Sequence, residues 1–518
     1  MKRSILLTLF VCFIIGQSQI LAAADQGGAA VVRPNIVFIL TDDHRWDSYG
    51  APDLQRIRTP NLDSIANDGT RFDNAFVTLA ICSPSRAACL TGRYGSANGV
   101  TAFGKVSLNK GETTFAHALR KAGYATGVAG KWHLKTTPQE CGFDFASTCW
   151  SNGTWYDRRF TIDGGSETMP GFVDDVTADE SIRFIRQATD ADKPFVLWMC
   201  TQVPHMDNKH SWPARQEYLD HHNVDEMPLP ETWNDDLDGK PAYLKSARNR
   251  TRALEYGYDD PSKIRSHIRD YRASAEQMDA AVGRVLNELK REKLKENTWI
   301  IFMGDNGWFL GEHGFTSKVL PYEESMRVPM AISGPSTSTQ VSNRIVLNID
   351  LTATIYELAG LDVPAELHGR SLLPIVSGRV PDDWRQSFLY EAPTPQLGSQ
   401  PLWAVRSKRW KYIETVPEQD TGQVMTELYD LGSDSVEIVN LAAHPDHQET
   451  ATRLAAELRQ HRKAIETQSN SEKTAPSTLS QPTRTDIHIS GIYPHLTTYG
   501  VYSQNGGHYK EGHNECGI

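Results

Sequence analysis

Short apolar runs alternate with amphipathic stretches along most of this 518-residue chain. Four runs of four or five residues are typical of strands buried on both faces: residues 36–40, 126–129, 195–199 and 299–303. Between them, apolar positions recur at helical spacing in residues 62–68, 113–122, 178–188 and 271–293. This alternation predicts an α/β fold: a large mixed, mostly parallel sheet covered by helices on both faces.

The pattern changes after residue 374. Short strand-like segments follow at 404–406, 410–413 and 427–431, and residues 450–465 have the spacing of one amphipathic helix. These elements predict a smaller C-terminal α+β subdomain. Residues 466–482 are polar and rich in Ser, Thr, Gln and Pro, which is typical of a linker. We therefore expect a main domain over residues 30–380, the subdomain over 381–466, and a linker and tail over 467–518.

The first 24 residues have the features of a signal peptide. Lys2 and Arg3 precede an apolar stretch, and small residues up to Ala24 supply a cleavage site. The stretch is shorter than the roughly 20 residues that span a bilayer, although an uncleaved anchor is the alternative. We expect an exported protein, periplasmic or secreted after cleavage near Ala24, with no stable membrane insertion.

The net charge of the chain narrows the classes of partner that it can bind. Removal of residues 1–24 changes the net charge from -11 to about -13, which disfavours nucleic acid as a partner. A site for an anionic ligand must therefore be locally cationic.

Cys141 and Cys149 are close enough in sequence to form a small disulfide loop, and two free thiols are an equal alternative.

Polar clusters follow each of the four predicted strands. Because ligands bind at the carboxyl ends of strands in open α/β sheets, these clusters are expected at one edge. They are Asp42-Asp43 after residue 40, Asp305-Asn306 after 303, Lys131 and His133 after 129, and His205 after 199.

The two acidic turns contain hard oxygen ligands. Asp42, Asp43, Asp305 and the amide of Asn306 are the ligand types that Ca²⁺ and Mg²⁺ prefer. An isolated Asp-Asp pair is more often a helix cap or a solvated turn. Two oxygen-rich turns after two buried strands favour one metal ion, Ca²⁺ with Mg²⁺ as the alternative.

Residues 82–93 carry the most specific motif, Cys-Ser-Pro-Ser-Arg-Ala-Ala-Cys-Leu-Thr-Gly-Arg. Pro84 suits the first turn of a helix, so Cys82 is expected at or just before a helix N-terminus. There the peptide dipoles favour negative charge. Arg86 would hold Cys82 or neutralise nearby carboxylates, whereas Arg93 is expected to be a surface or packing residue.

This motif resembles the signature of the type I sulfatases, which belong to the alkaline-phosphatase-like superfamily. The resemblance implies that a maturation enzyme oxidises Cys82 to formylglycine (3-oxoalanine), whose hydrate attacks sulfur and faces the metal. The family-like stretches cover roughly residues 33–465. By the same resemblance, the metal ligands are Asp42, Asp43, Asp305 and Asn306.

The resemblance also implies roles for the basic residues. Lys131 and Lys318 would contact the sulfate, His133 the hydrated aldehyde, and His205 the leaving-group oxygen. His313 would line the substrate pocket or be structural. The residue 30–380 domain would then be catalytic.

The implied activity is hydrolysis of sulfate esters of a carbohydrate. Residues 233–243 resemble glucosamine-6-sulfatases, which implies a glucosamine-6-sulfate type of substrate. One alternative is a phosphodiesterase or phosphonate monoester hydrolase on the same scaffold. A second is a non-catalytic glycan-binding homologue.

Overall fold

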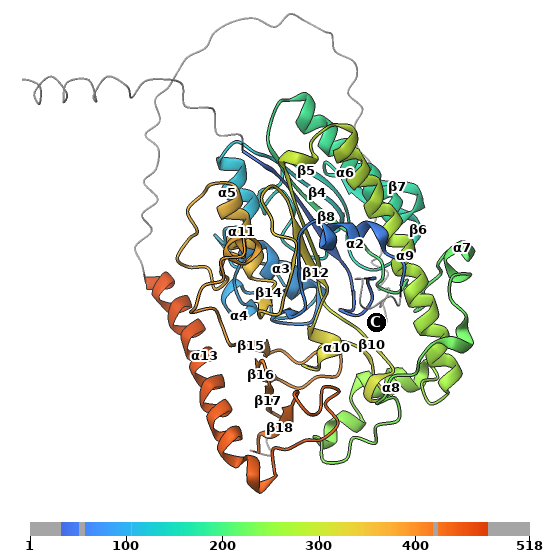
Figure 1. Ribbon diagram of the computed structural model, residues 1–518, viewed down its shortest axis with the longest axis vertical. Helices are drawn as coiled ribbons and strands as arrows, with labels where there is room; N and C mark the ends of the chain where they lie inside the picture. The colour runs from blue at the N-terminus through green and yellow to red at the C-terminus, as the bar shows by residue number, and fades with distance from the viewer. Residues whose placement is uncertain (1–32, 51–56, 105, 418–422, 475–518) are drawn as a thin grey trace, which may run out of the picture. The chain divides into compact units, whose positions relative to one another are not determined.

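A large sheet runs through the larger part of the structure (Figure 1). It has ten strands, in the order β13-β2-β12-β9-β1-β8-β4-β5-β6-β7. The computed structural model describes residues 33–50, 57–104, 106–417 and 423–474. The predicted signal peptide and most of the predicted linker and tail lie outside these residues.

The centre of the sheet consists of the four strands predicted from apolar runs. They are β1 (Asn35–Thr41), β4 (Ala125–Lys131), β8 (Phe195–Cys200) and β9 (Thr298–Gly304). β1 pairs in parallel with β9 and β8, and β8 pairs in parallel with β4. The register sets Thr41 beside Gly304 and Leu40 beside Cys200, so the carboxyl ends of these strands are aligned.

Both faces of the four central strands are buried, as the unbroken apolar runs predict. Along β1, Phe38 and Leu40 pack into one core and Val37 and Ile39 into the other. Helices α2, α6 and α9 cover the second core, and α3, α5 and α11 the first (Figure 1). Their bounds are α2 Pro60–Asn67, α3 Cys82–Thr91, α5 Phe115–Lys121, α6 Val173–Asp190, α9 Pro261–Arg291 and α11 Asp350–Leu358.

The outer strands make the sheet mixed. β12 runs antiparallel to β9 and β2, and β5, β6 and β7 are joined by antiparallel pairs. The outer strands are β2 Thr70–Phe72, β12 Met330–Ser333 and β13 Gln340–Ser342 at one side, and β5 Phe145–Cys149, β6 Tyr156–Ile162 and β7 Gly165–Phe172 at the other. The predicted mixed, mostly parallel sheet is confirmed.

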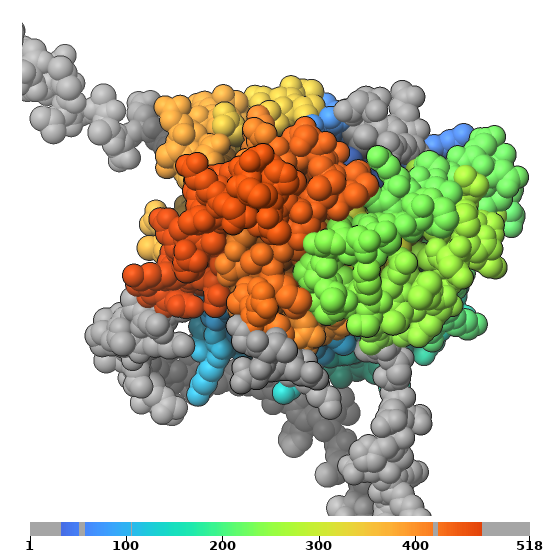
Figure 2. Space-filling model, turned by 90° about the horizontal axis from the view of Figure 1, so that it is seen from below, coloured from blue at the N-terminus to red at the C-terminus, as the bar shows by residue number. Residues whose placement is uncertain are grey.

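A second sheet of four antiparallel strands follows in the C-terminal part. It is formed by β15 (Ser387–Ala392), β16 (Leu402–Ser407), β17 (Trp410–Thr415) and β18 (Met425–Asp430). Helix α13 (Gln448–Thr474) continues past residue 466, where a linker was predicted. Figure 2 shows this part, in orange and red, beside the green segment near residue 240. Lys240 donates there to the Glu437 carbonyl, 2.7 Å away.

The remaining α-helices and strands are short. None of the helices described here is long and apolar enough to cross a membrane. The short elements are β3 Ala75–Phe76, α4 Gly95–Asn98, α7 Gln216–Leu219, α8 Arg248–Glu255, β10 Phe309–Leu310, β11 Thr316–Ser317, α10 Glu323–Met326, β14 Val346–Leu347 and α12 Leu373–Val376.

Cys141 and Cys149 are both free and buried, so the structure has the second of the two predicted alternatives. Cys141 packs into the core on one face of the sheet, and Cys149 into the core on the other face.

Candidate active site

The two acidic turns lie together at the carboxyl edge of the sheet. Asp42 and Asp43 follow β1, and Asp305 and Asn306 follow its neighbour β9. The Asp43 backbone N–H donates to Asp305 Oδ1 at 3.1 Å, and Asn306 Nδ2 donates to Asp43 Oδ1 at 2.6 Å. Asp43 has a φ of 55°, a conformation that aspartate tolerates better than most residues. The expected convergence of these four residues is therefore observed.

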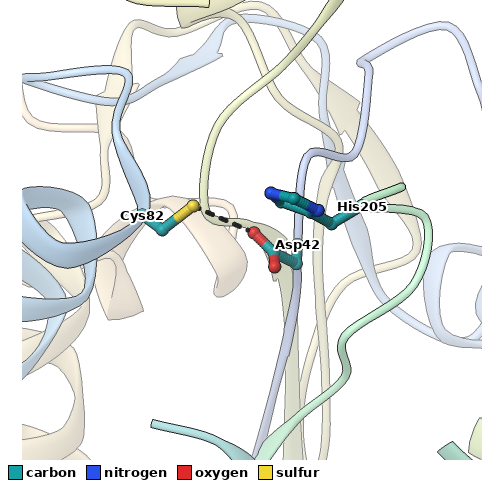
Figure 3. A group of neighbouring side chains, drawn as sticks. All are labelled: Asp42, Cys82 and His205. Carbon is teal, nitrogen blue, oxygen red and sulfur yellow. Dashed lines mark hydrogen bonds between the residues drawn. The ribbon is translucent and has the colours of Figure 1, made fainter. Parts of the chain in front are cut away.

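Cys82 faces this acidic edge from the first residue of α3. Ile81 before it is extended, and Pro84 occupies the first helical turn, as predicted. The Cys82 thiol donates to Asp42 Oδ1, with Sγ 3.2 Å away, and Figure 3 shows Cys82 and His205 approaching Asp42 from separate segments. The helix start therefore lies directly beside the first acidic turn.

The arrangement fits a divalent cation. One ligand atom from each of Asp42, Asp43, Cys82 and Asp305 lies within 4.8 Å of all the others. Asp43 Oδ2 is buried and accepts no hydrogen bond. Buried carboxylate oxygens without donors are costly unless a cation or proton satisfies them. These four residues therefore form a candidate metal site, and their oxygen-rich set suits Ca²⁺ or Mg²⁺.

Two lysines approach Cys82 from different segments. Lys131, the last residue of β4, pairs with Asp42, and its Nζ is 3.8 Å from Cys82 Sγ. Lys318, just after β11, pairs with Asp43, and its Nζ is 2.8 Å from the same sulfur. Burial lowers the pKa of each lysine, but the carboxylates outweigh burial and raise both pKa values. Both lysines therefore carry positive charge next to position 82.

Arg86 lies one helical turn after Cys82 and contacts the carboxylates rather than the cysteine. Its Nη2 is 2.9 Å from Asp305 Oδ2, and its Nη1 donates to the Lys131 carbonyl at 2.6 Å. Of the two predicted roles, charge neutralisation is the one that these contacts support. Arg93, beyond the other end of α3, pairs with Glu112 at 3.1 Å, in agreement with a packing role.

The two histidines differ in how they are placed. His205 Nδ1 is 2.7 Å from the Met206 carbonyl, which fixes the ring, and its Nε2 is 3.4 Å from Asp43 Oδ2. His133 has a φ of 55°, and β4 ends at Lys131, so the strand alternation that would place His133 on the same side as Lys131 does not extend to it. Its Nδ1 is buried without a hydrogen-bond partner, and no described interaction joins it to Cys82.

The pKa values reflect the crowding of charges. Burial raises the pKa of Asp42, but Lys131 and the other cations outweigh it and hold the pKa well below its usual value. Burial and the charge of Asp42 raise the pKa of Asp305 to about 7. Burial, reinforced by Asp42, also raises the pKa of the Cys82 thiol. Burial lowers the pKa of both His133 and His205.

Two residues that adjoin the site were not found from the sequence. The Tyr271 hydroxyl donates to the Asp43 carbonyl at 2.6 Å and accepts the Arg45 N–H at 2.9 Å. Tyr271 occupies an ordinary apolar position of an amphipathic helix, which gave no signal. Trp150 contacts His133, with ring centroids 6.2 Å apart, and follows a strand that was not predicted.

The contacts of His313 agree with the structural role among its two predicted alternatives. The side chain is fully buried, and its Nδ1 lies 2.8 Å from Asp235 and 3.2 Å from Lys240 Nζ. It therefore joins the 233–243 segment to the loop that leads to Lys318.

Comparison with known proteins decides the family. Residues 34–361 match the family described as sulfatase, and residues 311–464 match the family described as N-sulphoglucosamine sulphohydrolase, C-terminal. The chain belongs to the sulfatase family. It is thus an enzyme of the class that hydrolyses sulfate esters, with the expected alkaline-phosphatase-like fold.

Two named relatives and one solved structure are similar to this sulfatase over most of its length. The N-acetylglucosamine-6-O-sulfatase of Bacteroides thetaiotaomicron is 30% identical over 505 residues, covering 85% of this chain and 88% of the relative. The choline-sulfatase of Rhizobium meliloti is 27% identical, covering 80% and 83%. A solved structure in complex with its substrate, D-glucosamine-2-N,6-O-disulfate, has a TM-score of 0.75 and 29% identity, covering 84% and 98%.

Proposed function

We propose that this sulfatase removes sulfate from a sulfated saccharide of the 6-O-sulfated glucosamine type, with formylglycine at position 82 and one divalent cation. The observation that carries this proposal is the setting of Cys82. It begins a helix, faces the acidic edge, and lies between Lys131 and Lys318.

The balance of charge supports an anionic substrate. Asp42, Asp43 and Asp305 carry three formal negative charges, which Lys131, Lys318 and Arg86 offset. A divalent ion held by the carboxylates, Asn306 and the modified residue 82 would make the site net positive. When bound, it would stabilise charge on the sulfuryl oxygens. This local positive charge is what the acidic chain requires in order to bind a sulfate ester.

Each group of the site is assigned a separate role in the reaction. The hydrate of an aldehyde at position 82 supplies an oxygen nucleophile for sulfur, and re-forming the carbonyl later releases sulfate without attack of water on sulfur. Lys131 and Lys318 are placed to stabilise the sulfuryl oxygens. His205 is assigned the proton that the departing alcohol oxygen needs when the S–O bond breaks. His133 is assigned the proton lost from the second hydroxyl.

The substrate class rests on similarity and on the fold around the site. Both the relative from Bacteroides thetaiotaomicron and the solved complex act on or bind 6-O-sulfated glucosamine by their descriptions. The 233–243 segment is anchored by Asp235 and Lys240 to His313, in the loop that leads to Lys318. These observations support a saccharide over a small alkyl sulfate such as choline sulfate.

Two further parts of the proposal concern maturation and location. The N-terminal pattern supports export to the periplasm or the medium, with cleavage near Ala24. Oxidation of Cys82 requires a formylglycine-generating enzyme as a partner during biosynthesis. Peptide mass analysis of protein made with and without that enzyme would detect the modification directly.

The deciding experiment is a desulfation screen over defined sulfated glucosamine saccharides, with Ca²⁺, with Mg²⁺ and with chelator. Wild-type protein should release sulfate in a metal-dependent way. Cys82→Ala should lose activity by at least about 10³-fold, since it removes the nucleophile. Equal turnover by wild type and Cys82→Ala would refute the mechanism.

Two controls separate the parts of the proposal. Calcium should raise the melting temperature of wild-type protein but not of Asp43→Asn, because only the former keeps the charged ligand set. An aryl phosphodiester and an aryl sulfate should be compared as substrates. Faster hydrolysis of the phosphodiester would instead support the phosphonate or phosphodiester alternative.

A further inference from the structure

Trp150 is the most exposed of the twelve tryptophans, with half of its surface accessible. It directly follows β5 and lies against His133. The two rings meet edge to face, with centroids 6.2 Å apart and an interplanar angle of 79°. The His133 backbone N–H also donates to the Trp150 carbonyl at 2.7 Å. An exposed indole is therefore fixed beside a residue of the active site.

The segment that carries Trp150 is attached to both proposed proton-transfer residues. Besides the bond to His133, the indole N–H of Trp155 donates to the His205 carbonyl at 3.2 Å. Gln202, three residues before His205, donates to the Gly153 carbonyl at 2.9 Å. Segment 150–155 thus spans from the His133 side of the site to the His205 side.

The guanidinium of Arg158 also holds segment 150–155 in place. Arg158 Nη2 donates to the Ser151 carbonyl at 2.7 Å. A Cβ at Gly153 would lie 1.1 Å from the Arg158 guanidinium, so the absence of a side chain there permits this close packing. These contacts hold the backbone, and they leave half of the Trp150 surface accessible. A rigid backbone with an exposed indole is preorganised for a ligand.

We propose that Trp150 is a stacking platform for a pyranose ring of the saccharide substrate, beside His133 at the exposed edge of the site. This inference rests on the proposed saccharide substrate and names a residue that selects for it. The C–H face of a sugar ring is apolar and packs on an indole, which offers a large apolar surface at small entropic cost. Trp150 lies next to His133, and its segment also contacts the His205 carbonyl through Trp155, so the platform adjoins the site from which a saccharide would extend.

A purely structural role for Trp150 makes a different prediction. In that case the indole would act through the orientation of His133, and its loss would lower the maximal rate on every sulfate ester. A platform instead contributes binding to saccharides, so its loss would raise KM for the saccharide and leave kcat for a simple aryl sulfate unchanged.

The test uses the mature, metal-loaded enzyme and its variants Trp150→Ala and Trp150→Phe. For a 6-O-sulfated glucosamine disaccharide, Trp150→Ala should raise KM by about 10-fold or more, because it removes the stacking surface. Trp150→Phe should recover most of this loss, because a phenyl ring also stacks. The kcat for 4-nitrophenyl sulfate should stay within about twofold of wild type.

Trp299→Ala is the matched control, since Trp299 is a partly exposed tryptophan near the start of β9, at the opposite end from Asp305. It should change neither KM nor kcat. An unchanged KM in Trp150→Ala would overturn the platform, and so would a parallel fall of kcat on both substrates.

Failure of the proposed substrate is distinguishable from failure of the platform. If wild-type protein hydrolyses 4-nitrophenyl sulfate but no sulfated saccharide, the substrate class is wrong. Saturation-transfer NMR with an unsulfated N-acetylglucosamine oligosaccharide then decides the platform. Binding that is lost in Trp150→Ala would support it, and equal or absent binding in both proteins would overturn it.

Discussion

The guanidinium of Arg86 joins three separate segments of the site. It lies on α3, pairs with Asp305 after β9, and donates to the carbonyl of Lys131 at the end of β4. The side chains of both Arg86 and Asp305 are fully buried. Such a pair adds little over an apolar replacement of both partners, but removal of one partner leaves a charge buried and unpaired.

Arg86→Met is therefore expected to lower the free energy of unfolding by about 3–5 kcal/mol. Urea unfolding followed by fluorescence measures this change. Arg120→Met is the matched control, because Arg120 pairs with Asp144 at 3.5 Å and both side chains are exposed, by 43% and 59%. Its loss should cost less than about 1 kcal/mol. Similar losses in the two variants would contradict the role assigned to Arg86.

For single residues, the sequence could predict which side chains gather at the site better than it could predict their geometry. Asp42 and Asp305 each follow a buried strand and Lys131 ends one, so the edge rule for parallel sheets was enough to bring them together. His133 was different. Its positive φ breaks the strand pattern after Lys131, and no residue in its neighbourhood indicates this. Tyr271 likewise looks like an ordinary core residue of its helix.

Among the elements, strands buried on both faces were predictable and exposed edge strands were not. β1 and β8 are unbroken apolar runs, which only a covered sheet can accommodate. β6 and β7 are largely exposed, and their polar composition conceals them. One signal was available: Asp163-Gly164 is a typical two-residue hairpin turn, with φ values of 48° and 84° that fit type I′.

Gly164→Ala tests the assignment of Asp163-Gly164 to a type I′ turn. Because a φ of 84° strains a residue with a Cβ, the free energy of unfolding should fall by about 1 kcal/mol. No heavy atom lies within 4 Å of the added Cβ, so a clash would not confound the result. Gly165→Ala, the next residue and the first of β7, lacks a positive φ and should be nearly neutral. Thermal unfolding of both variants distinguishes them, and equal shifts would contradict the turn argument.

Across the whole molecule, the C-terminal sheet supports the active site. Glu323 of α10 pairs with Arg406 and Lys411 of this sheet at 3.1 and 3.0 Å. Ser325 of the same helix accepts the N–H of Gly307, next to the metal turn, at 2.8 Å. The second family match also starts at residue 311, before Lys318, and so includes this loop together with the sheet. The sequence predicted the subdomain, but contacts between residues so far apart in the chain have no local signal.

Tyr390 of β15 is the clearest of these long-range supports. Its hydroxyl accepts the N–H of Ala80, two residues before Cys82, at 3.0 Å, and donates to the carbonyl of Val319, next to Lys318. One buried hydroxyl of the C-terminal sheet thus joins the segment that leads to Cys82 to the segment that contains Lys318. Removing it leaves a buried N–H and a buried carbonyl without this partner.

Tyr390→Phe should therefore lower the free energy of unfolding by about 1–3 kcal/mol. It should also lower kcat for the saccharide and for the aryl sulfate alike, because Cys82 and Lys318 serve both reactions. Tyr412→Phe is the matched control in the same sheet, since its hydroxyl bonds only to Glu414 of its own strand among the contacts described, at 3.0 Å. That variant should keep wild-type kcat. If Tyr390→Phe loses stability but retains full kcat, the C-terminal sheet supports the fold without setting the geometry of the site.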